Sequence, residues 1–168
     1  MRRRIVFGFG AFALAVAGSA IHPFGRMRDD RDVPLLEGAR IDAMDLDRIH
    51  RSCSNCHSER VEWPWYSYAA PVSWLVERDI HTARSRLNLS RWNEYSVEER
   101  VTLLSAIGSV AKNEVMPPLR YRTLHPESRL SESARLALYE WTRSERRRLG
   151  SRESMPLIPT THGDSKRE

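Results

Sequence analysis

The stretch Arg51–Ser67, RSCSNCHSERVEWPWYS, contains both cysteines of the chain, a histidine directly after the second, and three large aromatic residues. Two thiols and an imidazole at this spacing can bind zinc, form a redox dithiol or a disulfide, or attach a haem. Which of these chemistries applies determines how the rest of the chain must fold around the segment.

Cys53-x-x-Cys56-His57 has the spacing at which c-type haem is attached. Two thiols three residues apart on one helical turn can each add to a vinyl group of the porphyrin and form a thioether bond. The next side chain, His57, then directs its imidazole at the iron as the proximal ligand. The spacing therefore predicts one covalently attached haem c, with Cys53 and Cys56 as its anchors.

The competing chemistries need partners that are scarce in this sequence. A structural zinc site requires four ligands, and there is no second C-x-x-C pair. A thioredoxin-like dithiol needs a βαβ setting, and no strand pattern is present. A disulfide between the two cysteines would close a very small loop and stabilise little else. In a zinc site, the thiols would have to recruit two of His50, His57, His81 and His125.

Met116 is the candidate for the sixth ligand of the iron. It stands in NEVMPPLRY, after the third predicted helix, and the two prolines that follow prevent this helix from continuing. The alternatives are that Met116 fills the core, or that His81 is the distal ligand. Ligation by histidine and methionine would suit electron transfer better than oxygen binding. The other methionines are Met1, Met27, Met44 and Met155, which lie near the termini, in the tether or near the first helix.

The N-terminus predicts export from the cytoplasm. Arg2–Arg4 form a positive region, and the run Ile5–Ile21 follows without a charged residue. We interpret residues 1–21 as a retained single-span anchor, with a cleaved signal sequence as the alternative. The positive-inside rule places the following domain on the periplasmic side of the inner membrane. After cleavage the domain would instead be soluble in the periplasm.

The hydrophobic periodicity beyond the anchor predicts a small all-α domain of about four helices. We assign residues 22–40 to a tether, because they carry proline, glycine and mixed charge without periodicity. Residues 41–150 form the predicted domain, and residues 151–168 a disordered tail.

Local signals predict where the helices begin and end. Asp42 and Ser131 are expected N-caps, Ser96 and Glu99 form a capping-box pattern, and Gly150 is the expected terminator of the last helix. The second helix is predicted to start at a proline and to bury one stripe, made of Val72, Leu75, Val76, Ile80 and Ala83. The third and last helices are each predicted to bury one stripe, made of Val101, Leu104, Ile107 and Ala111 and of Ala134, Leu138 and Trp141.

The composition argues against nucleic-acid binding and against catalysis by the chain alone. The net charge is +5, but Arg2–Arg4 supply three of these charges, so the remainder carries +5 − 3 = +2. A nucleic-acid-binding domain would concentrate Lys and Arg on one face. Because neither a nucleophile with a base nor paired carboxylates can be recognised, we do not expect an enzyme.

With these residues in view, the chain resembles the bacterial haem-binding domain family, whose members look like exported, single-haem, cytochrome c-like domains. The similarity is carried by CSNCHSERVEWPWYSYAAPVSWLV, DIHTARSRLNLSRW and VMPPLRYRTLHPESRLSESARLALYEW. It implies a class-I-like cytochrome c fold and haem binding by Cys53, Cys56 and His57, with Met116 at the Met-Pro position of the family. Ala83 stands where the family usually has glycine.

These observations lead us to expect a membrane-tethered periplasmic one-electron carrier that serves redox partner proteins. The alternatives are a haem-based sensor, in which Met116 dissociates for a small gas, and a peroxidase-like protein with an open distal side. The aromatic residues after His57 either pack on the porphyrin or belong to the core. Arg84 or Arg120 could pair with a haem propionate.

Overall fold

The computed structural model describes residues 10, 14, 16–25 and 29–153 of the 168-residue chain. Most of the predicted anchor, residues 1–21, and most of the predicted tail, residues 151–168, lie outside the described residues. Within the described part, none of the helices is long and apolar enough to cross a membrane.

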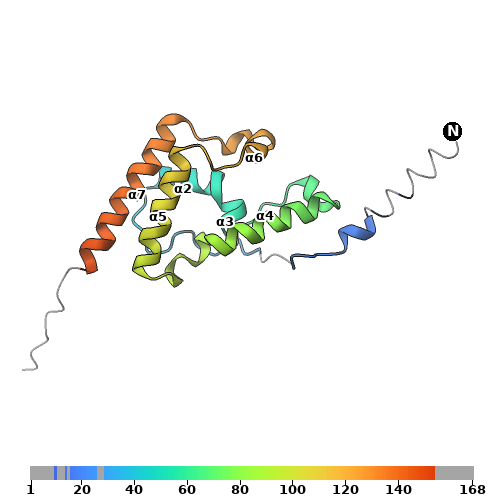
Figure 1. Ribbon diagram of the computed structural model, residues 1–168, viewed down its shortest axis with the longest axis horizontal. Coiled ribbons are helices and arrows are strands. Elements are labelled where there is room, and N and C mark those ends of the chain that lie inside the picture. The colour runs from blue at the N-terminus through green and yellow to red at the C-terminus, as the bar shows by residue number, and fades with distance from the viewer. Residues whose placement is uncertain (1–9, 11–13, 15, 26–28, 154–168) are drawn as a thin grey trace, which may run out of the picture.

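Every regular element of the described residues is a helix or a helical turn, which confirms the predicted all-α class (Figure 1). The predicted first helix is α2 (Ala43–Ile49), which continues through a π-helical turn, η1 (His50–Ser54), into α3 (Asn55–His57). The other predicted helices are α4 (Val72–Arg86), α5 (Val97–Lys112) and α7 (Glu132–Glu153).

Four shorter elements connect these helices. They are the 3-10 turns η2 (Trp65–Tyr68), η3 (Leu89–Glu94) and η4 (Pro126–Ser128), and the short helix α6 (Leu119–Leu124). The sequence did not predict α6, since its segment is rich in proline. The helix begins directly after Pro118, because a proline disfavours helix at and before its own position but permits it afterwards.

Helices α5 and α7 pack side by side (Figure 1). Their close approach depends on Gly108 of α5. A Cβ atom at this position would lie only 2.4 Å from Oγ1 of Thr142 and 3.3 Å from Cδ2 of Tyr139, both on α7. The predicted stripes of the two helices meet here, since Leu104 and Leu138 are buried in one cluster.

One hydrophobic core joins the α2 segment, η3, α5 and α7. Nε1 of Trp141 donates to the carbonyl of Arg40 at 2.8 Å and so fastens the chain before α2 to α7. Leu36, in the stretch 22–40 that the sequence assigned to a tether, is also buried in this core. The buried members are Leu36, Ile49, Leu89, Trp92, Leu104, Ile107, Ala111, Leu138, Trp141 and Leu149.

The predicted N-caps are confirmed. The side chains of Asp42 and Ser131 each accept a hydrogen bond from a backbone N–H of the first turn, at 2.8 and 3.2 Å. Ser96 and Glu99 form the complete capping box. The predicted stop at Gly150 is wrong, because α7 continues for three more residues. A glycine inside a helix costs only about 1 kcal/mol, which a long packed helix tolerates.

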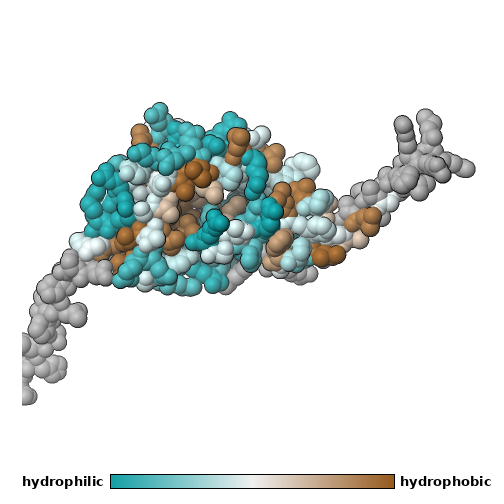
Figure 2. Space-filling model, in the orientation of Figure 1, coloured by the Kyte–Doolittle hydropathy of each residue, from teal (hydrophilic) through white to brown (hydrophobic). Residues whose placement is uncertain are grey.

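The predicted buried stripe of α4 is wrong at its start. Val72 and Leu75 are each 40% exposed, whereas Ser73 and Glu77 are buried. The reason is that the N-terminal segment covers the polar side of the helix, where Nδ1 of His22 lies 2.6 Å from Oε1 of Glu77. Figure 2 shows hydrophobic residues at the end of the molecule from which this segment departs.

Replacement of Gly108 by valine should lower the free energy of unfolding by about 1–3 kcal/mol, because the new side chain overpacks the contact between α5 and α7. Urea unfolding measures the effect. Gly150→Ala is the matched control, since no atom of the described residues lies within 4 Å of a Cβ atom there, and it should be neutral or stabilising. Equal stability of the two variants would contradict the close-packing argument.

Candidate haem site

The residues of the C-x-x-C-H motif lie on one continuous helical segment. Cys53 is in the π-helical turn η1, and Cys56 and His57 are in α3. π-helical turns are rare, but many of those that occur lie at functional sites, because they widen the helix locally and change the direction of its side chains. Oγ of Ser54 donates to the carbonyl of His50 at 2.5 Å and supports the turn.

Both thiols of the motif are free and half-buried, so the disulfide that the sequence left open is not formed. Burial raises the pKa of Cys53 to about 12, and the neighbouring Cys56 adds to the shift. Burial, followed by repulsion from Asp79, raises the pKa of Cys56 to about 11, while Arg120 and Arg84 oppose the shift. Both side chains are therefore neutral thiols at neutral pH.

His57 is held in one orientation by a backbone carbonyl. Its Nδ1 lies 3.2 Å from the oxygen of Leu87, which can only accept, so Nδ1 carries the proton and donates. Burial lowers the pKa of the imidazole and keeps it neutral at neutral pH. Nε2 therefore retains its lone pair. A neutral imidazole with Nδ1 bonded and Nε2 available has the form required of a metal ligand.

The turn that supplies this carbonyl is bonded to the chain directly after the motif. Glu59 is buried, and its Oε1 accepts from Nε of Arg91 at 2.9 Å and from Nδ2 of Asn88 at 3.4 Å. The backbone N–H of Glu59 donates to Oγ of Ser90 at 3.0 Å. These contacts fix the distance between Leu87 and the motif.

The connection between α5 and α7 packs against the motif from the other side. Nδ2 of Asn55 donates to the hydroxyl of Tyr121 at 2.8 Å, and Oδ1 of Asn55 accepts from the N–H of Glu62 at 2.8 Å. Oγ of Ser52 donates to the carbonyl of Ser128 at 2.9 Å. Both α6 and η4 are therefore anchored on the segment that carries the cysteines.

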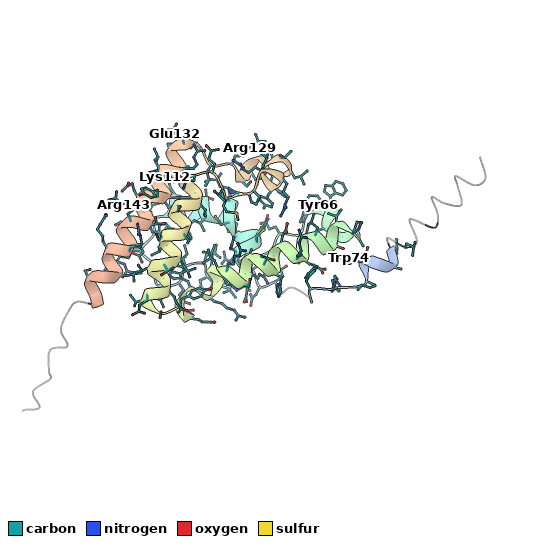
Figure 3. All side chains as sticks on the ribbon, viewed as in Figure 1. Tyr66, Trp74, Lys112, Arg129, Glu132 and Arg143 are labelled. Carbon is teal, nitrogen blue, oxygen red and sulfur yellow. The ribbon has the colours of Figure 1, made fainter. Side chains whose placement is uncertain are left out.

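An aromatic cluster lies near Cys56. The hydroxyl of Tyr66 is 2.6 Å from Nε2 of His125, and this imidazole stacks on Tyr121 with ring centroids 4.3 Å apart. Nδ1 of His125 is 3.0 Å from Oε1 of Glu127. Burial raises the pKa of both tyrosines. The hydrogen bond between Tyr121 and Asn55, the neighbour of Cys56, places the cluster beside the motif. Tyr66 and Trp74 are labelled in Figure 3.

Met116 lies in the turn between α5 and α6 and is half-buried. Glu114, two residues earlier, has a φ of +57°, which is uncommon for a residue other than glycine. Its carboxylate pairs with Arg122 at 3.6 Å and with Arg135 of α7 at 2.5 Å. The turn is thus held from α6 and from α7. Cys53 and His57 share one helical segment, whereas Met116 is linked to it through the contacts of α6.

Arg84, whose Nε bonds to the residue directly after His57, has unused hydrogen-bonding capacity. Its Nε donates to the carbonyl of Ser58 at 2.8 Å, while its Nη2 is buried and finds no partner among the described residues. Arg120, by contrast, donates to Asp79 at 2.6 Å and is exposed. A buried N–H without a partner is costly, so Arg84 fits an anionic group of a bound cofactor.

The rival ligands are placed differently. His81 is exposed on α4, and His50 lines a small cavity of about 80 Å³. Among the residues that the structure describes, no three His, Cys, Asp or Glu side chains are grouped to hold a metal ion, as a zinc site would require.

A larger cavity, of about 270 Å³, lies between the N-terminal segment and α4, lined in part by His22 and Glu77.

Residues 32–144, which include the C-x-x-C-H motif and Met116, match the family described as the haem-binding domain. The chain belongs to this family. The match runs from the loop before α2 into α7, so it covers the elements that hold His57, Met116 and Arg84 in place.

The haem-binding domain is also similar to one curated protein. It is 27% identical over 99 residues to the Cytochrome c peroxidase Ccp of Escherichia coli (strain K12). The alignment covers 57% of this chain and 21% of the relative, so the chain matches about a fifth of the length of that protein. No solved structure matches the chain.

Several supporting residues of the haem-binding domain had no signal in the sequence. The carbonyl of Leu87 is a backbone group, which no residue type reveals. The sequence did not predict the contact between Asn55, which precedes Cys56 in the motif, and Tyr121, which follows the prolines. The pair of the buried Glu59 and the exposed Arg91 has a weak signal at most, because both residue types are common on surfaces.

Asn55→Ala should destabilise the haem-binding domain by about 2 kcal/mol, since two hydrogen bonds are lost, and Tyr121→Phe by about 1 kcal/mol. The double variant should lose less than the sum, because the two side chains share one bond. Urea unfolding of all three variants forms the test. Asn93→Ala, on the exposed side of η3, is the control and should change stability by less than about 0.5 kcal/mol. Strict additivity would contradict the contact.

Proposed function

We propose that this protein is a membrane-tethered periplasmic one-electron carrier with one covalently attached haem c. The observation that carries the proposal is the hydrogen bond from Nδ1 of His57 to the carbonyl of Leu87, on a C-x-x-C-H motif. It leaves a neutral imidazole with Nε2 available as the proximal ligand. A bound haem would supply reversible one-electron reduction and oxidation of its iron.

The residues of the candidate site fit a covalently attached haem. Cys53 and Cys56 are unpaired thiols on one helical segment, as two thioether bonds require. Met116, in a turn fixed by ion pairs to two helices, is the proposed distal ligand. Arg84, whose buried Nη2 has no hydrogen-bond partner in the described part of the chain, is the proposed partner of a propionate. The helical architecture supports a class-I-like cytochrome c fold, in which α7 packs near the motif-bearing segment.

The proposed location rests on the sequence. Arg2–Arg4 followed by the uncharged run Ile5–Ile21 support a retained anchor, with the domain on the periplasmic side. Covalent attachment is useful there, because a lost haem is not easily replaced outside the cytoplasm.

A peroxidase-type activity is the second candidate function. It is favoured by the similarity to Cytochrome c peroxidase Ccp and by His125, which contacts both Glu127 and Tyr66 near Cys56. Such an activity would need an open position on the iron. A high-spin oxidised spectrum and rapid binding of carbon monoxide to the reduced protein would favour this candidate. A low-spin spectrum supports the electron carrier.

Covalent attachment is tested by replacing the thiols. Cys53→Ala and Cys56→Ala should each leave one thioether, and the double variant should release its haem into acidified organic solvent. Mass spectrometry of the denatured chain measures the retained haem, with Ser105→Ala as the control. A double variant that keeps haem covalently bound would show that the cysteines are not the anchors, and a wild-type chain without haem would end the proposal.

Met116→Ala should abolish the methionine-to-iron charge-transfer band of the oxidised protein and lower the reduction potential, because a thioether ligand raises it. Met44→Ala is the matched control, since Met44 is 66% exposed on α2. Optical redox titration measures both variants. If Met116→Ala keeps the band and the potential of the wild type, the distal ligand is another residue.

Arg84→Gln should also lower the reduction potential, because loss of a positive charge near the haem stabilises the oxidised iron. Arg78→Gln removes the same charge from an exposed position on the same helix and serves as control. Its potential should stay near that of the wild type, since solvent screens exposed charges. Equal shifts in both variants would exclude a specific role of Arg84.

A further inference from the structure

An exposed apolar face lies at the junction of η2 and α4. Trp65 and Tyr68 on η2 are 86% and 68% exposed, and Val72 and Leu75 at the start of α4 are each 40% exposed. They belong to the stretch 63–76, which contains no charged residue in a chain that is 29% charged. Contiguous exposed apolar groups of this kind mark an interaction surface, whereas single ones are ordinary.

The N-terminal segment is bonded to this same end of the domain. Nε1 of Trp74 lies 3.2 Å from the carbonyl oxygen of Gly18 and 2.9 Å from that of Ile21, and donates to both. The N–H of Ala70 donates to Oγ of Ser19 at 3.0 Å. Residues 18–21 therefore lie against the junction of η2 and α4, at the end of the domain where Figure 1 shows the N-terminal segment. They are the end of the uncharged run Ile5–Ile21, which the sequence predicts to enter a membrane.

We propose that this face rests on the surface of the lipid bilayer, with Trp65 and Tyr68 in the headgroup region. The proposal rests on the retained anchor of the proposed function and adds which side of the domain faces the membrane. Indole and phenol rings are enriched at the boundary between lipid and water, because they combine an apolar body with a polar tip. The absence of charge over the stretch 63–76 suits the same position.

The cavity beneath this face is consistent with a hydrated headgroup layer rather than with a dry protein interface. Ser73 and Glu77 line it, and their Oγ and Oε2 atoms are buried without a hydrogen-bond partner among the described residues. Headgroups and their water can supply such partners. Tyr66, between the exposed Trp65 and Tyr68, turns instead toward His125 near the motif. The haem site therefore lies close to the membrane side of the domain.

Lipid photocrosslinking of the haem-loaded full chain tests the orientation. The chain is reconstituted into phosphatidylcholine vesicles that contain a diazirine-bearing phospholipid, and the labelled tryptic peptides are mapped by mass spectrometry. The peptide 61–78 should carry about tenfold more lipid than peptides 41–48 and 136–143. These control peptides contain Met44 and Leu136, which are also exposed. Trp65→Ser combined with Tyr68→Ser should reduce the label on 61–78.

Each outcome decides the proposal. Even labelling of the three peptides in a chain that floats with the vesicles overturns this orientation but leaves the anchor intact. A chain that does not float overturns both. The membrane face is supported if the label is confined to peptide 61–78, is lost in the double variant and is kept in Met44→Ser. If the haem spectrum is the same in every variant, the outcome for the membrane face does not affect the electron-carrier proposal.

Discussion

The hydrogen bond between Nδ1 of His57 and the carbonyl of Leu87 is the constraint on which the site depends. It fixes the tautomer and the plane of the imidazole, and it connects the motif to the end of α4. The bond holds only if the turn after α4 stays in place. The buried carboxylate of Glu59, bonded to Arg91 and Asn88, ensures this. Glu59, of a residue type that is common on surfaces, thus lies in the interior and supports the position of His57.

The remaining helices hold the segment of Met116 close to the segment of the motif. The absence of a side chain at Gly108 brings α5 and α7 into contact, and these two helices hold the connection that contains Met116 between them. Glu114 ties that connection to both α6 and α7, and Tyr121 ties it to Asn55 of the motif segment. The haem-binding domain is therefore built from helix ends that meet around one short segment, rather than from a single long helix.

One short stretch of sequence contacts three different surroundings. Residues 63–76 turn Tyr66 toward the motif and Trp65 and Tyr68 toward the outside, while Trp74 binds the N-terminal segment. Because three kinds of contact alternate over a few residues, hydrophobic periodicity alone could not assign them. This explains why the start of α4 was predicted with the wrong buried face.

The sequence by itself determined the all-α class, the N-caps, the C-x-x-C-H motif and the stripes of α5 and α7. These features depend on neighbours within one or two helical turns, and local chemistry decides them. Only the tertiary structure decided that α7 continues past Gly150 and that Ser73 and Glu77 are buried. It also decided that one N–H of Arg84 is left without a partner among the residues described. Each of these outcomes depends on a segment distant in the chain. Burial and hydrogen bonding are properties of the surroundings, which a residue's own neighbours in sequence do not specify.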